Sequence, residues 1–167
     1  MLIMGIDPGI AITGYGFIKQ RGPTSGQAET YGCLRTPAHT QLSLRLLQLH
    51  EELSALLTEW QPDVMAVEKL FFNRNTTTAF TVGQARGVML LAAAEHRVPV
   101  VEYTPLQVKQ AVVGYGRAEK QQVQQMVKAL LHLPQLPKPD DVADALAIAI
   151  CHLHSQQWQR LTSERRQ

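Results

Sequence analysis

The chain has 167 residues, a formal net charge of +2 and 45% hydrophobic residues, values typical of one globular domain with a sizeable core. No apolar run is long enough to span a bilayer, and the amino terminus lacks the features of a signal peptide, so we expect a cytoplasmic protein without a membrane partner. The two cysteines lie far apart and form no CxxC pair, so neither a zinc knuckle nor a disulfide framework is indicated.

The first part of the chain predicts three strands before any helix. Residues 2–6 form an apolar run that ends on Asp7, and Gly9 to Ile12 can form a short hairpin connection. Residues 13–20 and 28–36 predict the second and third strands. The order of these segments predicts an antiparallel meander of three strands.

The middle of the chain alternates helices with strands. Apolar residues recur every three or four positions over 41–60, as on one face of an amphipathic helix. Residues 64–68 form a short apolar run typical of a strand covered on both faces, and this run ends on Glu68. After a loop over 71–78, we expect a helix over 79–96 and a strand over 98–103. This alternation predicts parallel strands joined through helices.

Two glycines stand four residues apart on the second predicted helix, at Gly83 and Gly87. Glycine destabilises a helix interior by about 1 kcal/mol relative to alanine. Two glycines on one face therefore predict that another backbone packs closely there, either within the fold or across a dimer.

Helices over 106–113 and 117–133 are expected next, followed by a proline-rich linker and a last helix that begins at Asp140. We expect a single domain over 1–157 and a frayed polar tail over 158–167. The fold class is α/β, with a mixed five-stranded sheet that contains the antiparallel meander and is flanked by helices.

Four acidic residues are candidates for one site: Asp7, Glu68, Asp141 and Asp144. The first two each end a predicted strand, and the other two are three residues apart on one face of the last helix. Four converging carboxylates repel one another and require cations. Oxygen ligands without Cys or His suit Mg²⁺ or Mn²⁺, and two such ions about 4 Å apart can support phosphodiester hydrolysis.

Structural roles remain open for the same acids. Asp7 could only shape the turn at Asp-Pro-Gly. Asp140 is the expected helix N-cap, and Asp141 could merely complement the helix dipole. Asp144 lies among apolar residues, where a ligand is the more economical interpretation of an acid.

Six segments, taken in order and spacing, resemble the bacterial RuvC-type Holliday-junction resolvases over nearly the whole chain. They are Gly5-Ile6-Asp7-Pro8-Gly9 with Thr13-Gly14-Tyr15-Gly16, Glu68 with Phe71, Gly83-Gln84-Ala85-Arg86-Gly87, Gln107-Val108-Lys109-Gln110, Ala118-Glu119-Lys120, and Asp141-Val142-Ala143-Asp144-Ala145-Leu146-Ala147. The resemblance implies a ribonuclease-H-like fold and a homodimer that makes paired nicks in a four-way DNA junction. It also implies a branch-migration motor of the RuvA and RuvB type as a partner.

The resemblance assigns a role to individual residues as well. The four acids match the metal-binding catalytic acids of the family. Lys109 and Lys120 match basic residues near the scissile strand, and Phe71 matches an aromatic residue that stacks on bases at the junction centre. Arg74 and Arg86 are further basic candidates for DNA binding. Alternatively, Phe71 packs inward and the two lysines are solvated helix residues.

Two other interpretations of the chain stay open. The segment Asp7-Pro8-Gly9 with Thr13 also resembles the first phosphate loop of sugar-kinase and actin-like ATPases, but those proteins close two related domains over the nucleotide. A junction-binding module without catalysis is the third interpretation. We expect Gly14 and Gly16 to allow close packing beside the acid site, not to bind a nucleotide phosphate.

Overall fold

The computed structural model describes the backbone of residues 1–69 and 76–164 and the side chains of residues 1–69 and 79–156. Its elements are, in chain order, β1 (Leu2–Asp7), β2 (Ile12–Gln20), β3 (Gly26–Arg35), α1 (Leu42–Trp60), β4 (Val64–Glu68), α2 (Thr76–Glu95), β5 (Val100–Tyr103), α3 (Pro105–Val113), α4 (Lys120–Leu130) and α5 (Asp140–Glu164).

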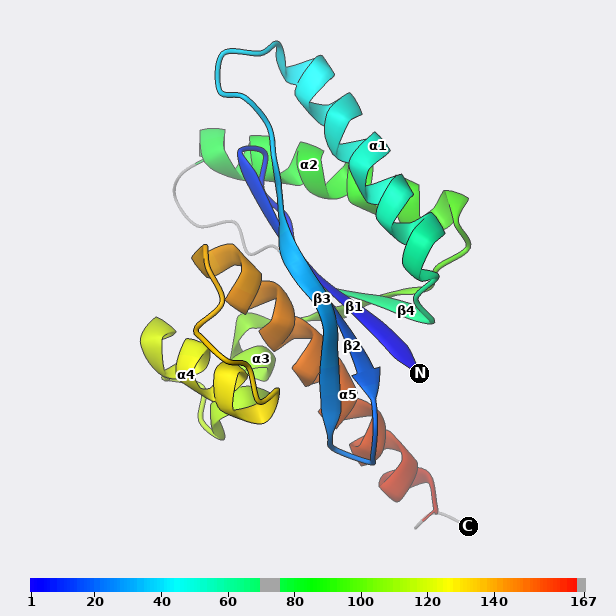
Figure 1. Ribbon diagram of the computed structural model, residues 1–167, viewed down its shortest axis with the longest axis vertical. Coiled ribbons are helices and arrows are strands. Elements are labelled where there is room, and N and C mark those ends of the chain that lie inside the picture. Colours follow the sequence, from blue (N-terminus) through cyan, green and yellow to red (C-terminus); the bar gives the residue numbers. More distant parts are fainter. Residues whose placement is uncertain (70–75, 165–167) are drawn as a thin grey trace.

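The five strands form one mixed sheet in the order β3-β2-β1-β4-β5 (Figure 1). The pairs β1–β2 and β2–β3 are antiparallel, whereas β1–β4 and β4–β5 are parallel. The predicted meander and the α/β fold class are therefore confirmed. Because β1 and β4 are parallel neighbours, their carboxyl ends lie at the same edge of the sheet.

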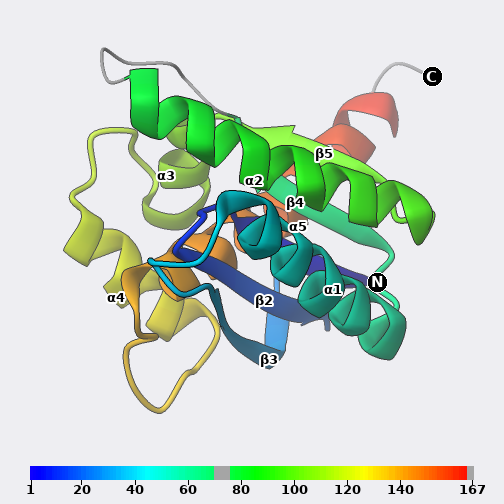
Figure 2. The same ribbon diagram turned by 90° about the horizontal axis from the view of Figure 1, so that it is seen from above.

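Helices cover both faces of the sheet, so that the molecule has three layers (Figures 1 and 2). One face packs against α1 and α2 through a core that includes Phe17, Leu53 and Met89. The other face packs against α3, α4 and α5 through a second core that includes Val108 and Leu146. The central strands β1 and β4 are buried along most of their length, as the continuous apolar run over 64–68 predicts for β4.

Glycines in β1 and β2 allow α5 to lie directly on the sheet. A Cβ atom at Gly5 would overlap the Ala145 carbonyl oxygen, and one at Gly14 would overlap the Asp141 carbonyl oxygen. A Cβ at Gly16 would run into the side chain of Leu146. The prediction that Gly14 and Gly16 serve close packing is confirmed, and the helix that they admit carries two of the candidate acids.

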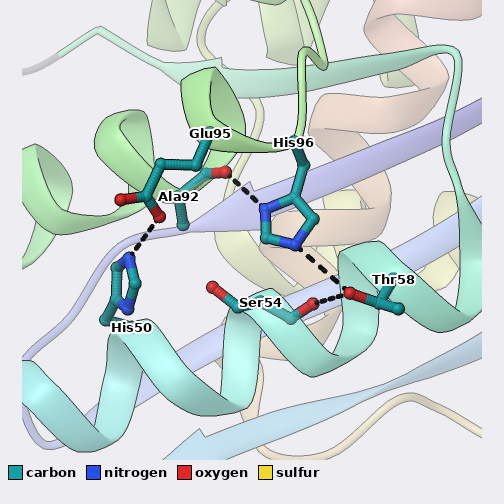
Figure 3. Close-up of polar contacts among 6 residues, drawn as sticks. All are labelled: His50, Ser54, Thr58, Ala92, Glu95 and His96. Atoms are coloured by element: carbon teal, nitrogen blue, oxygen red, sulfur yellow. Dashed lines mark hydrogen bonds and ion pairs between the residues drawn. The ribbon is translucent and has the colours of Figure 1, made fainter.

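Polar contacts join α1 to α2 along their exposed edge (Figure 3). His50 Nε2 lies 2.7 Å from Glu95 Oε2, and His96 Nε2 lies 3.2 Å from Thr58 Oγ1. The Thr58 hydroxyl donates to the Ser54 carbonyl at 2.8 Å. The contacts of His50 and His96 link α1 to the carboxyl end of α2, whereas the bond from Thr58 to Ser54 lies within α1.

The glycine face of α2 has no neighbour in the described part of the chain. A Cβ atom at Gly83 or Gly87 would meet no atom within 4 Å. The prediction of close backbone packing within the fold is therefore wrong for residues 1–69 and 76–164. Phe80 and Leu91 lie on the same helix and expose 69% and 53% of their surfaces.

Several helix boundaries differ from the sequence prediction. Helix α2 begins at Thr76, three residues before the predicted Ala79. Helix α4 spans Lys120–Leu130 instead of 117–133, because Glu119 and Gln122 form a capping box at its start. Helix α5 continues to Glu164, past the position from which a frayed tail is predicted. Over residues 1–69 and 76–164, none of the helices has the length and apolar character that crossing a membrane requires.

Candidate active site

The four predicted acids come from three elements at one edge of the sheet. Asp7 is the last residue of β1 and Glu68 is the last residue of β4. These strands pair in parallel up to Ile6 and Val67, which brings the two acids side by side. Asp141 and Asp144 lie in the first turns of α5, which packs across β1 and β2 at this edge.

A cavity of about 250 Å³ lies where these elements meet. Three of the predicted acids line it, and both predicted lysines line it from α3 and α4. Asp141 is not part of the lining. The remaining lining residues are apolar, so the cavity combines charged and hydrophobic side chains. The lining residues are Asp7, Glu68, Pro105, Val108, Lys109, Lys120, Val123, Asp144, Ala147 and Ile148.

Asp7 is the most perturbed acid of the group. Burial raises its pKa to about 7, and the negative charges of Asp144, Glu68 and Asp141 contribute to the rise, whereas Lys120 opposes the shift. All four predicted acids therefore interact electrostatically at Asp7. Such mutual repulsion in a partly buried site is relieved by a bound cation or by a proton.

The other two acids in the cavity are perturbed in the same direction. Burial raises the pKa of Glu68, Asp144 adds to the rise, and Lys109 lowers it. Burial also raises the pKa of Asp144, against its contact with Lys120. Lys109 therefore acts on Glu68, whereas Lys120 acts on both Asp144 and Asp7.

Lys120 lies at the mouth of the cavity, with 53% of its side chain exposed. Its Nζ atom is 3.1 Å from Asp144 Oδ2 and 3.5 Å from Asp140 Oδ2. Burial lowers its pKa, but these contacts with Asp144 and Asp140 outweigh burial and raise it. The sequence analysis assigned Asp140 only to the helix start, and nothing in the local sequence pairs it with a lysine twenty residues earlier.

The turn after Asp7 is held by buried threonines that the sequence analysis did not single out for this role. The Thr13 hydroxyl is fully buried and donates to the Gly9 carbonyl at 2.6 Å. Thr36, also buried, donates to the Ile10 carbonyl and accepts a hydrogen bond from Arg45 Nε at 2.8 Å. These contacts fix the backbone that leaves Asp7. Only the tertiary structure brings Thr36 to this turn.

The other three candidates for DNA binding are Arg86, Phe71 and Arg74. Arg86 is only 16% exposed, and its guanidinium pairs with Glu102 on β5. Contact of Arg86 with DNA stays a prediction. Phe71 and Arg74 lie outside the described residues.

The described residues hold no group of three or more His, Cys, Asp or Glu side chains arranged to bind a metal ion as they stand. The donor set nevertheless suits hard cations, because it consists of carboxylate oxygens from three elements around one cavity. The raised pKa of Asp7 is consistent with this, since its neighbours crowd negative charge into the cavity. The type and the charge of these side chains are therefore those that bind divalent cations such as Mg²⁺ or Mn²⁺.

The sheet order, the helices on both faces and the acids at the ends of β1 and β4 define a protein of the ribonuclease-H-like fold. The crystal structure of the yeast mitochondrial Holliday junction resolvase Ydc2 shares this fold, with a TM-score of 0.64 at 14% identity. A family model described as crossover junction endodeoxyribonuclease RuvC matches residues 3–152. The chain belongs to this family.

Individual members of the family align with this chain over almost their full lengths. The chain is 66% identical over 155 residues to the crossover junction endodeoxyribonuclease RuvC of Desulfitobacterium hafniense (strain DSM 10664 / DCB-2), covering 93% of each chain. It is 58% identical over 161 residues to that of Alkaliphilus metalliredigens, covering 96% of this chain and 98% of the relative. The structure of T. thermophilus RuvC in complex with a Holliday junction substrate has a TM-score of 0.91 at 37% identity, covering 95% and 96%.

Proposed function

We propose that this chain is a structure-selective endodeoxyribonuclease that resolves four-way DNA junctions in recombination and repair by paired, symmetric nicks. The observation that carries the proposal is the cavity that joins Asp7, Glu68 and Asp144 to Lys109 and Lys120. Carboxylates suit cations that activate water, and ammonium groups suit a phosphate backbone. Family membership and the junction-bound relative support the same conclusion.

Two Mg²⁺ ions, which Mn²⁺ can replace, are the proposed cofactors. Bound ions of this kind activate a water molecule and stabilise the leaving oxygen in phosphodiester hydrolysis. Asp7, Glu68, Asp141 and Asp144 are the proposed ligands. Asp7 is the proposed central ligand, because the negative charges of the other three acids all raise its pKa.

The basic and aromatic candidates complete the proposed DNA site. Lys109 and Lys120 face the cavity and neutralise the phosphate at the cut. Phe71 is proposed to stack on unpaired bases at the junction centre, with Arg74 and Arg86 as further DNA contacts. We propose that residues 1–157 form the nuclease domain and that residues 158–167 form a polar tail.

The substrate panel that tests the proposal consists of a synthetic four-way junction, linear duplex, flap and RNA–DNA hybrid, each with and without Mg²⁺. We expect symmetric nicks in the junction only, and only with the metal present. Denaturing gels of end-labelled strands measure both the position and the symmetry of the cuts. Cleavage of all substrates alike would contradict junction selectivity. Junction binding without nicks would indicate a binding module without catalysis. Hydrolysis of ATP by the chain would favour the kinase-like interpretation.

We also propose that the chain is a homodimer and that α2 supplies the interface. Phe80, Gly83, Gly87 and Leu91 follow the three- and four-residue spacing of one helix face. The two glycines have open space above them, and the two apolar side chains are exposed. A second copy of the same helix would bury this face and allow close backbone contact.

A charge on this face tests the dimer. We expect Phe80→Glu to weaken self-association by at least about tenfold, because it places a carboxylate in an apolar contact. Sedimentation velocity over a concentration series measures the effect. The matched control is Tyr115→Glu, which alters an exposed aromatic residue between α3 and α4, in the opposite layer. Equal dissociation of the two variants, or a dimeric Phe80→Glu variant, would contradict the assignment of the interface.

A branch-migration motor of the RuvA and RuvB type is the proposed partner, and the cytoplasm is the proposed location. Membership of the RuvC family supports both proposals. A four-way junction is first saturated with RuvA- and RuvB-type proteins. We expect more of this chain to sediment with that complex than with the junction alone. Sedimentation of the chain with the junction alone, unchanged by the motor, would contradict a direct contact.

A further inference from the structure

Asp140 faces the active-site lysine from outside the cavity. Its Oδ2 atom lies 3.5 Å from Lys120 Nζ, and Asp144 Oδ2 lies 3.1 Å from the same nitrogen. Asp144 lines the cavity, whereas Asp140 does not and is 60% exposed. Lys120 is thus held between one carboxylate within the site and one beyond it.

Gln124 fixes the orientation of this outer carboxylate. Its Nε2 atom donates to Asp140 Oδ1 at 2.9 Å, which leaves Oδ2 directed to Lys120. Gln124 lies four residues after Lys120 on α4, so both side chains leave the same face of that helix. The start of α5 is therefore tied to the first turns of α4 through both oxygens of Asp140.

We infer that Asp140, oriented by Gln124, is a positioning residue that holds the Lys120 ammonium group at the mouth of the acid cavity. The inference rests on the proposed function, because it assigns Lys120 to the scissile phosphate. A lysine side chain has four rotatable bonds, so it still adopts several conformations when only one partner contacts its ammonium group. Asp140 restrains Lys120 independently of Asp144, which the site uses for its own chemistry.

The competing explanation is that Asp140 serves only the helix start. An acid in the first turn of a helix favours the helix through the positive end of its dipole. In that role Asp140 would act on the whole of α5, and its effect would not depend on which residue stands at position 120. A double-mutant cycle separates the two explanations.

The cycle uses single-turnover nicking of a synthetic junction at saturating Mg²⁺. We expect Asp140→Asn to slow nicking by about two- to fivefold, the range of an exposed ion pair, and to have no further effect in the Lys120→Ala background. Gln124→Ala should slow nicking in the same way, whereas Gln125→Ala, on an exposed position of the same helix, should not. Equal slowing by Asp140→Asn in both backgrounds would overturn the inference.

A second measurement does not depend on cleavage. In metal-free protein at fixed pH, acylation of Lys120 by an N-hydroxysuccinimide ester is followed by mass spectrometry, with Lys128 on the same helix as the internal reference. Asp140→Asn should raise labelling of Lys120 by about two- to fivefold relative to Lys128. Unchanged labelling would overturn the inference. A wild-type protein that does not nick junctions, but shows the labelling change, would instead contradict the proposed function alone.

Discussion

Replacement of Asp7 by asparagine is expected to abolish nicking of a four-way junction and to preserve binding to it. The asparagine keeps the size of the side chain but removes the charge that the proposed cations require at the centre of the acid group. We expect the nicking rate to fall by about a thousandfold or more. Gel-shift titration in the presence of Ca²⁺ measures binding, and single-turnover assays with Mg²⁺ measure nicking.

The matched control for this variant is Glu51→Gln, which removes an exposed carboxylate from α1, in the layer opposite α5. It should nick at the wild-type rate. Full activity of Asp7→Asn with Mg²⁺ present would refute the metal-site assignment, and loss of junction binding together with nicking would indicate misfolding of the site.

The same variant should change the dependence of stability on pH in metal-free protein. The pKa of Asp7 is raised from 3.8 to about 7, so the folded state retains a proton that the unfolded state releases between these values. Wild-type stability should therefore fall as pH rises through this window and level off above it. The asparagine side chain cannot ionise, so at about pH 8 we expect the variant to be more stable, by about 2–4 kcal/mol, and near pH 5 the difference should shrink. Thermal unfolding in EDTA measures this, and parallel pH profiles would contradict it.

The second large effect is expected for Gly14→Ala. The added Cβ would overlap the Asp141 carbonyl, a backbone atom that cannot rotate away, so α5 must shift from the sheet. We expect a loss of about 3 kcal/mol or more in the free energy of unfolding, at the upper end of the cost of overpacking. Nicking should also fall under conditions in which the variant is fully folded, because the same shift displaces Asp141 and Asp144.

Denaturant unfolding followed by circular dichroism measures the stability of this variant. The control is Gly22→Ala in the β2–β3 connection, where the Cβ would meet only the side chain of Ser25, which can move. That variant should stay within about 0.5 kcal/mol of wild type. A Gly14→Ala protein as stable as Gly22→Ala would show that α5 does not depend on the glycine for its position.

Much of this fold was accessible from periodicity alone. The apolar strands that end on Asp7 and Glu68 have the bounds that their hydrophobic patterns predict, and the last helix begins at Asp140 as predicted, because these signals are local. The start of α4 was not predicted, since the capping box of Glu119 with Gln122 outweighs the helical pattern before it. For Gly83 and Gly87 the sequence left open whether the packing partner lies within the fold or across a dimer, and no described segment of the chain covers them.

The sequence by itself predicted that Asp7 and Glu68 lie close together, because residues at the carboxyl ends of adjacent parallel strands share one edge of the sheet. The tertiary structure decided how these acids are used. It places Asp7, Glu68 and Asp144 in the cavity wall, leaves Asp141 beside it, and pairs Arg86 with Glu102. It also brings Asp140 and Gln124 to Lys120. Such contacts depend on how α4 and α5 pack against each other, and no local pattern encodes the angle and offset between two helices.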